Sequence, residues 1–315
     1  MFYNKLMTLI LTALTPEFIV QASDRMLTYP SGDVARSDAV KSVVVGVDTS
    51  FGYTGMAGLP VTASMAAARP YLKAGEWLTT SEWIATVAAN ASSSKLADTA
   101  LLAAEGAKAM QLIGPRESSK LTIFIRTNWT MNERTGDLEP SLVRISNVMD
   151  ENRFEYSLTR IGSDRHSLLD TSLKKADLSS IGFSPDSLER RIDEEVAGNS
   201  DPAKVLALLV DAVREVSRLL RAKGSLIVGE DVIQTCIPRE VVARALKNGS
   251  GWTIVNGPAS IDYVTFAHND PTSADVKPVS PVHVLGGNIV GTLNISQLGV
   301  RLGEDQVSLG PLRAS

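Results

Sequence analysis

The chain has 315 residues, 44% of them hydrophobic, which is enough for a sizeable core in one large domain or two modest ones. Its 31 basic and 35 acidic residues give a net charge of −4, so no excess of positive charge suggests binding to nucleic acid. The chain has one cysteine, Cys236, so no intrachain disulfide can form. It has no run of about 18 apolar residues of the kind that predicts a membrane-spanning helix.

Residues 5–25 have two interpretations. As a secretory signal they combine a basic start, an apolar run over residues 6–14 and a small-residue cleavage site ending at Ala22, so the mature chain would begin at Ser23. As structure they form two buried strands joined by a turn at residues 15–17. We favour the second interpretation because Glu17 is awkward in a cleavage region and natural in a turn.

The first sixty residues predict four strands, at 8–14, 18–23, 41–47 and 51–58, which we expect to form one antiparallel meander. A capping-box pattern at residues 79–82 predicts the start of a helix, because a hydroxyl and a carboxylate at this spacing satisfy the free N–H groups of a first turn. The later elements follow from periodicity and turn residues: helices at 83–91 and 95–113, strands at 120–130, 141–148 and 153–161, helices from 184 and 201–224, a strand at 225–237, a helix from 239 and a strand at 260–268.

This order predicts an α+β fold of two antiparallel sheets covered by helix pairs. Residues 8–270 would form the domain. Residues 271–315 are rich in Pro, Gly, Ser and Asn, so we expect a loop-rich C-terminal extension. Cys236 lies in an apolar run and is interpreted as a small buried hydrophobic residue of a strand.

Four residues stand at a particular spacing in the N-terminal strands. Thr8 opens the first strand, Asp24 follows sixteen positions later with Arg25 beside it, Lys41 comes seventeen beyond Asp24, and Gly55 fourteen beyond Lys41. This pattern resembles that of N-terminal nucleophile hydrolases, in particular the proteasome β subunits and uncharacterised bacterial proteins similar to them. The resemblance implies a four-layer αββα sandwich, with two antiparallel sheets flanked by helix pairs.

The resemblance also implies a role for each of these residues. Thr8 would be the nucleophile and its free α-amine the base, as in other N-terminal threonine enzymes. Lys41 would hold that amine in its neutral form, because a nearby positive charge lowers the pKa of an amine. Asp24 would hold Lys41 by a charge-assisted hydrogen bond, and the backbone N–H of Gly55 would stabilise the oxyanion.

This mechanism requires Thr8 to be the first residue of the mature chain. Residues 1–7 are therefore expected to be either a propeptide or an unused upstream start, and we favour translation from Met7 followed by removal of that methionine. The family also places a serine and an aspartate late in the chain to support the threonine amine. Here Phe183 stands at the serine position and the aspartate is missing, so Ser184 and Ser225 are the candidate substitutes.

These features predict a cytoplasmic amidohydrolase or peptidase that acts on a peptide or small amide, needs no cofactor and forms a homo-oligomer. The three histidines, His166, His268 and His283, lack ligand spacing, so no metal site is expected, and neither nucleic acid nor a membrane is expected as a partner. The alternative is a catalytically inactive subunit of the same fold with a role in assembly.

Overall fold

The computed structural model describes residues 8–28, 34–36, 39–46, 48–90, 95–113, 121–132, 134–151, 153–161, 165–198, 201–247, 263–267, 282–285 and 288–290. The predicted propeptide, residues 1–7, lies outside these residues. Of the predicted C-terminal extension, only two short strands lie within them, β15 (Val282–Leu285) and β16 (Asn288–Val290).

The first sheet has five antiparallel strands around the N-terminal hairpin. The hairpin turn is closed by Thr15, whose hydroxyl donates to the carbonyl of Phe18 and accepts from its N–H at 2.7 and 2.9 Å. This confirms the predicted hairpin. In spatial order the strands are β12 (Leu168–Thr171), β1 (Ile10–Leu14), β2 (Phe18–Asp24), β13 (Val232–Pro238) and β14 (Tyr263–Ala267).

The second sheet has seven strands, antiparallel except for the parallel pair β15 and β5. The predicted four-strand meander is therefore wrong, because β1 and β2 belong to the first sheet and β5 and β6 to the second. Alternating side chains identify a strand, but they do not identify its neighbour. In spatial order the strands are β11 (Arg153–Arg160), β10 (Leu138–Asp150), β9 (Thr122–Met131), β6 (Thr49–Gly55), β5 (Ser42–Val45), β15 and β16.

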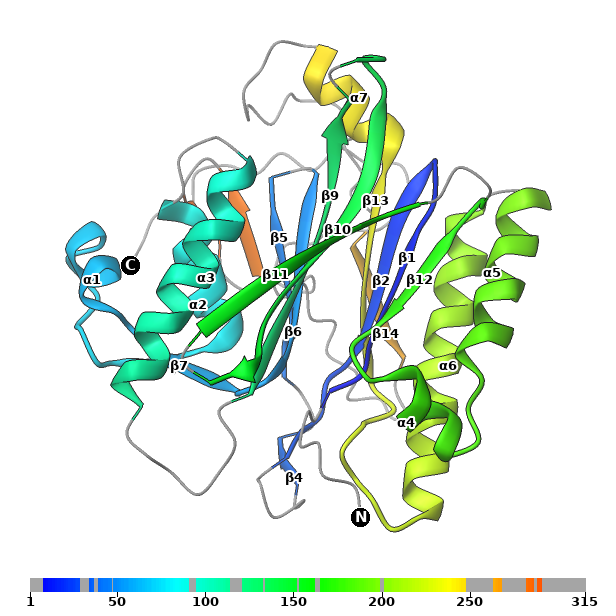
Figure 1. Cartoon of the computed structure of the whole chain (residues 1–315), viewed down its shortest axis with the longest axis horizontal. Helices are drawn as coiled ribbons and strands as arrows, with labels where there is room; N and C mark the ends of the chain where they lie inside the picture. Colours follow the sequence, from blue (N-terminus) through cyan, green and yellow to red (C-terminus); the bar gives the residue numbers. More distant parts are fainter. Residues whose placement is uncertain are drawn as a thin grey trace, which may run out of the picture.

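Helices pack on one face of each sheet (Figure 1). On the first sheet, α5 (Pro185–Gly198) and α6 (Pro202–Ala222) bury an apolar stripe against β1 and β2, and the predicted stripe of α6 is buried at all five of its positions, Val205, Leu209, Val213, Val216 and Leu220. On the second sheet, α2 (Thr80–Asn90) and α3 (Lys95–Leu112) bury a core against β5, β6 and β9. The predicted capping box starts α2, with Thr79 and Glu82 each bonding the backbone N–H of the other.

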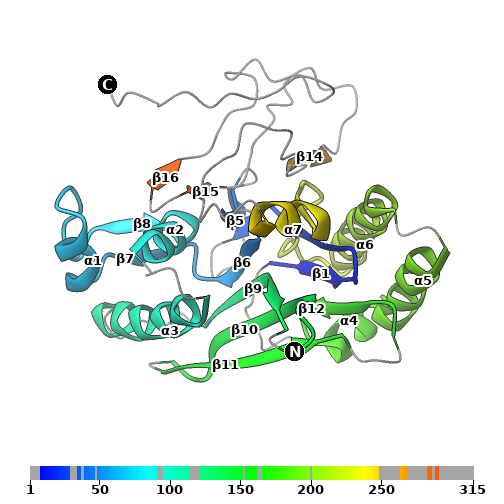
Figure 2. The same ribbon diagram turned by 90° about the horizontal axis from the view of Figure 1, so that it is seen from above.

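A third apolar cluster joins the two sheets, and Figure 2 shows their strands from above, between the two groups of helices. Ile10 and Ile19 of the first sheet meet Ile123 and Ile125 of the second. The α+β class with two largely antiparallel sheets and helices on them is thus confirmed. The remaining elements are β3 (Leu27–Thr28), β4 (Val34–Arg36), β7 (Gly58–Pro60), α1 (Ala63–Ala68), β8 (Trp77–Thr79), α4 (Lys175–Ser180) and α7 (Arg239–Lys247).

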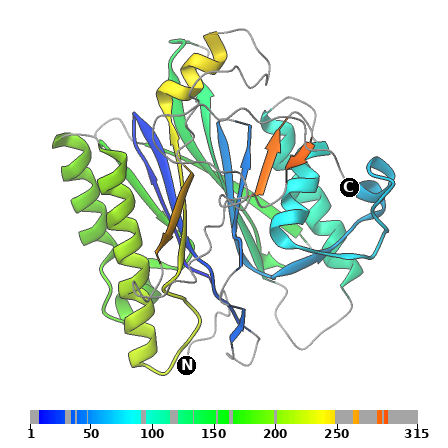
Figure 3. The same ribbon diagram turned by 180° about the vertical axis from the view of Figure 1, so that it is seen from behind.

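The view from behind in Figure 3 shows the small β3–β4 hairpin at the end of the strands where the chain begins. None of the helices in the described part of the chain is both long and apolar enough to span a membrane.

Candidate active site

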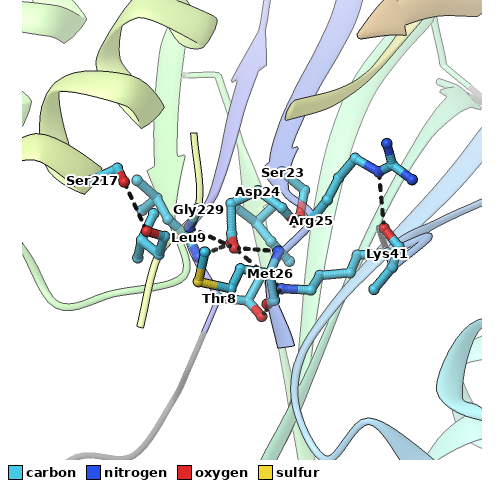
Figure 4. A network of polar contacts seen from close by, with 12 residues as sticks. Thr8, Leu9, Ser23, Asp24, Arg25, Met26, Lys41, Ser217 and Gly229 are labelled. Atoms are coloured by element: carbon cyan, nitrogen blue, oxygen red, sulfur yellow. Dashed lines mark hydrogen bonds and ion pairs between the residues drawn. The ribbon is translucent and has the colours of Figure 1, made fainter. Parts of the chain in front are cut away.

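Thr8, Asp24 and Lys41 come together although they belong to different sheets. Lys41 immediately precedes β5 of the second sheet, and its Nζ lies 2.7 Å from Thr8 Oγ1 and 3.3 Å from Asp24 Oδ2 in the first sheet (Figure 4). It also donates to the backbone carbonyl of Met26. All three side chains are at most 2% exposed. The spacing in the sequence thus corresponds to one buried polar cluster.

The Asp24 carboxylate is held by three backbone N–H groups in addition to Lys41. Leu9 donates to Oδ1 at 2.8 Å, and Met26 and Gly229 donate to Oδ2 at 3.0 and 3.2 Å. Gly229 precedes β13 and is packed so closely that an added Cβ would lie 2.9 Å from Cβ of Met26. Asp24 therefore fixes the start of β1, the end of β2 and the loop before β13 relative to each other.

Burial has the largest effect on the pKa values of Asp24 and Lys41. It raises the pKa of the Asp24 carboxyl, against the opposite effects of Lys41 and the three N–H groups, and it lowers the pKa of Lys41 from its usual 10.5, against the effect of Asp24. Lys41 nevertheless meets three oxygen acceptors, on Thr8, Asp24 and Met26, which match the three N–H donors of an ammonium group. Lys41 is thus arranged to donate to the Thr8 hydroxyl, and not to take its proton.

Ser172 also holds Thr8, although nothing in the sequence predicted this contact. Its Oγ donates to the carbonyl of Thr8 at 2.9 Å and accepts from the N–H of Ile10 at 2.8 Å. Its own N–H donates to the carbonyl of Ile10 at 2.9 Å. Ser172 is 164 residues from Thr8, and the only local signal was a small polar residue directly after a short strand.

Ser184 and Ser225, the predicted substitutes for the late supporting residues, make other contacts. Ser184 accepts from the N–H of Ser187 at 3.2 Å at the start of α5, and Phe183 is buried in the core that α5 and α6 share. The N–H of Ser225 donates to the carbonyl of Leu220 at the end of α6. The segment around Phe183 is therefore a helix start. The described residue that contacts the backbone of Thr8 in place of these serines is Ser172.

Gly55 has a structural reason to be glycine. Its φ is +103°, and an added Cβ would lie 2.0 Å from the carbonyl oxygen of Leu121, at the end of β6 where it pairs with β9. Its described contacts are with β9, so its role at an oxyanion stays a prediction.

The rest of the described chain has fewer groups suited to catalysis or metal binding. Cys236 is buried in the core of the first sheet, as the sequence predicts. Within the described ranges, no group of three or more His, Cys, Asp and Glu side chains is arranged to hold a metal ion. A cavity of about 220 Å³ lies between α5 and α6, and its lining includes Arg191, Asp211 and Glu215 but none of the Thr8 cluster.

Comparison with known proteins gives little further information. No family model and no curated protein matches the chain. Among solved structures, it matches an Anbu (Gly-1) mutant from Hyphomicrobium sp. strain MC1 with a TM-score of 0.42 and 11% identity, over 85% of this chain and 89% of that one. The predicted membership in a group similar to proteasome β subunits is therefore wrong. The matched structure is Anbu, and no family model of a proteasome β subunit matches the chain. At this TM-score the likeness by itself assigns neither fold nor activity.

Proposed function

We propose that the protein is a threonine-type amidohydrolase or peptidase in which Thr8 is the nucleophile after its α-amine has been exposed. The observation that carries the proposal is the 2.7 Å contact between the buried Lys41 ammonium and Thr8 Oγ1. A positive charge at this distance favours the alkoxide over the hydroxyl and so makes Thr8 a better nucleophile. The arrangement of Asp24, which holds Lys41 in place, supports the same role.

The base in this proposal is the α-amine of Thr8. All three donors of Lys41 have acceptors, which leaves the lysine no free lone pair for the proton of the hydroxyl. An α-amine has an ordinary pKa of about 7.7 to 8.0, and a nearby ammonium favours its neutral, proton-accepting form. Exposure of this amine requires loss of residues 1–7, by cleavage or by translation from Met7 and removal of that methionine.

The reaction then follows two steps. Thr8 Oγ1 attacks the substrate carbonyl while the α-amine takes the hydroxyl proton, and the tetrahedral oxyanion is stabilised by the N–H of Gly55. The C–N bond breaks, the amine returns the proton to the leaving nitrogen, and an ester on Thr8 remains. Water hydrolyses this ester and regenerates Thr8. The αββα sandwich of the N-terminal nucleophile hydrolases, with residues 8–270 as one domain and 271–315 as an extension, belongs to the same proposal.

The test measures the mature N-terminus and turnover together. Intact mass should show a chain that begins at Thr8, and a panel of fluorogenic peptide and simple amides should identify a substrate. We expect Thr8→Ala to lower kcat by about 10³-fold or more, because removal of a nucleophile leaves only binding and oxyanion stabilisation. Thr8→Ser keeps a hydroxyl at the same place and should retain measurable activity.

Retention of residues 1–7 in the mature protein, or equal turnover in wild type and Thr8→Ala, would contradict the proposal. A correctly processed chain that hydrolyses no amide would instead favour the non-catalytic assembly subunit. Light scattering of the same sample would then show whether the chain forms the oligomer that this alternative requires.

A further inference from the structure

Extended beyond the ends of β1, β2 and β13, the register of these strands puts Thr8, Arg25 and Asp231 in one row of the first sheet. One residue further into the sheet, the backbone N–H of Asp24 donates to the carbonyl of Leu9 on one side, and Asp24 pairs with Val232 on the other. In the next row, the N–H of Arg25 donates to the carbonyl of Asp231 at 3.0 Å. Neighbouring strands are about 4.8 Å apart, so Thr8 and Asp231, two strands apart, have backbones roughly 10 Å from each other.

Side chains in this row face the second sheet. Leu9 and Val232 pack in the core beneath α6, and successive residues of a strand point to opposite faces. By this alternation, Thr8 and Asp231 lie on the face opposite α6, the face that carries Ile10 in the cluster between the sheets. The nucleophile and the Asp231 carboxylate thus share one side of the first sheet, at the end where β1 begins.

Among the described residues, the Asp231 carboxylate has no ion-pair partner. Its Oδ1 is buried and has no hydrogen-bond partner among the described residues, and no ion pair joins Asp231 to any of them. Glu230 beside it is paired with Arg221 at 3.1 Å. The Nε of Arg25 donates to the carbonyl of Ala39 at 3.3 Å, which directs its guanidinium toward the segment before β5 (Figure 4).

A buried carboxylate oxygen without a donor is costly, and a cation or a strong donor that fills the place removes that cost. Asp24 and Lys41 form an ion pair with each other, whereas Asp231 forms no ion pair with another described residue. A substrate whose carbonyl lies at Thr8 would bring a long side chain within reach of Asp231, since roughly 10 Å suits a basic side chain extended from the residue under attack.

We infer that Asp231 is a specificity-determining residue that binds the ammonium or guanidinium group of a lysine or arginine side chain in the substrate. This inference rests on the proposed function of Thr8. It assigns the substrate class as peptides or amides with a basic residue on the acyl side of the cleaved bond. Asp231 takes no part in bond breaking. Its replacement should therefore change kcat/KM for basic substrates and leave the turnover of uncharged substrates nearly unchanged.

The experiment compares three peptide amides that differ only at the residue before the cleaved bond, which is lysine, norleucine or glutamate. We expect kcat/KM for the lysine substrate to exceed that for norleucine by about tenfold or more, which corresponds to ~1.4 kcal/mol or more for one charge-assisted bond. Asp231→Asn should bring this ratio close to one and leave norleucine turnover within about twofold. Asp231→Lys should make the glutamate substrate the preferred one. Glu230→Gln, which changes the paired neighbour, should keep the lysine preference.

A lysine-to-norleucine ratio that is the same in wild type and Asp231→Asn overturns the inference while leaving Thr8 as the nucleophile. A binding measurement separates the two proposals further. Calorimetry on the Thr8→Ala chain should show tighter binding of the lysine peptide than of the norleucine peptide, and Asp231→Asn in that background should abolish the difference. Equal binding overturns the role of Asp231. A difference that depends on Asp231, in a protein without any turnover, supports the cation site while the proposed activity fails.

Discussion

At the scale of single residues, Lys41 links the segment before β5 to the N-terminal hairpin through its side-chain hydrogen bonds. It is fully buried and bonds to Thr8 before β1, to Asp24 at the end of β2 and to Met26 just after it. A buried ion pair is weak evidence for stability, because both charges lose hydration. The presence of the buried Lys41–Asp24 pair beside the Thr8 hydroxyl is better explained by a role in catalysis than by a contribution to folding. For this reason the cluster is the basis of the proposed function.

Removal of the lysine charge gives a test of this pair. Lys41→Met leaves Asp24 buried with three N–H donors but no counter-charge, so we expect the free energy of unfolding to fall by about 3–5 kcal/mol. Urea denaturation at neutral pH measures the loss. Lys175→Met is the matched control, because Lys175 pairs with Asp186 and Glu189 at the surface and its loss should cost less than about 1 kcal/mol. A similar effect of both variants would mean that Asp24 does not depend on Lys41.

At the scale of elements, Glu105 connects α3 with the short helix α1. Its carboxylate accepts from Ser64 at 2.8 Å, from Lys108 at 2.7 Å and from Thr62, and the Thr62 hydroxyl also caps α1 by accepting from Met65. Burial acts to raise the pKa of Glu105, but the hydrogen bonds from Lys108, Thr62 and Ser64 outweigh it and hold the pKa below its usual 4.5. A six-residue helix is too short to be stable alone, so this carboxylate anchors it.

The lowered pKa has a definite consequence for stability. A carboxyl whose pKa is lower in the folded chain stabilises it fully above the unfolded value and loses this effect as the pH falls through the folded value. Glu105→Gln should therefore lower the free energy of unfolding by about 1–3 kcal/mol at neutral pH, and the difference from wild type should shrink below a pH of about 4.5. Urea denaturation over a series of pH values measures this. The exposed Glu76, changed to Gln, should have an effect within about 0.5 kcal/mol.

At the scale of the whole molecule, the two sheets are joined by an apolar cluster and by polar contacts between residues of the two sheets. Trp129 of the second sheet is fully buried in this cluster, and its Nε1 donates to the carbonyl of Ile237 in the first sheet at 3.1 Å. A second connection runs from Arg144 of β10 to Asp170 of β12 at 2.9 Å. Since the Thr8 cluster contains side chains of both sheets, its geometry depends on how the sheets are packed.

Trp129→Phe tests this connection, because it keeps an aromatic ring but leaves the Ile237 carbonyl without its donor. We expect a loss of about 1–3 kcal/mol in the free energy of unfolding. Thermal unfolding followed by circular dichroism measures it, with Trp77→Phe as control, since Trp77 is 47% exposed and its replacement should cost within about 0.5 kcal/mol. Equal stability of Trp129→Phe and wild type would show that the carbonyl is satisfied in another way.

Much of the local structure could be predicted from periodicity and turn residues. The hairpin of β1 and β2, the stripe of α6 and the capping box of α2 all agree with the structure, because each depends on contacts within a few residues. The strand predicted at 225–237 is shorter, since β13 begins at Val232 and the residues before it form the loop that brings Gly229 to Asp24.

The sequence by itself determined the long strands and helices, the α+β class and the grouping of Thr8, Asp24 and Lys41, but not short elements such as β12 and α1. Only the tertiary structure decided which sheet each hairpin joins, that Ser172 holds the backbone of Thr8, and that Asp231 follows the row of Thr8 across the first sheet. The physical reason is the distance along the sequence over which each kind of contact acts. Periodicity reports which side of an element is buried, whereas partners 164 residues from Thr8, or 205 residues from Asp24, are chosen by the packing of entire sheets and helices.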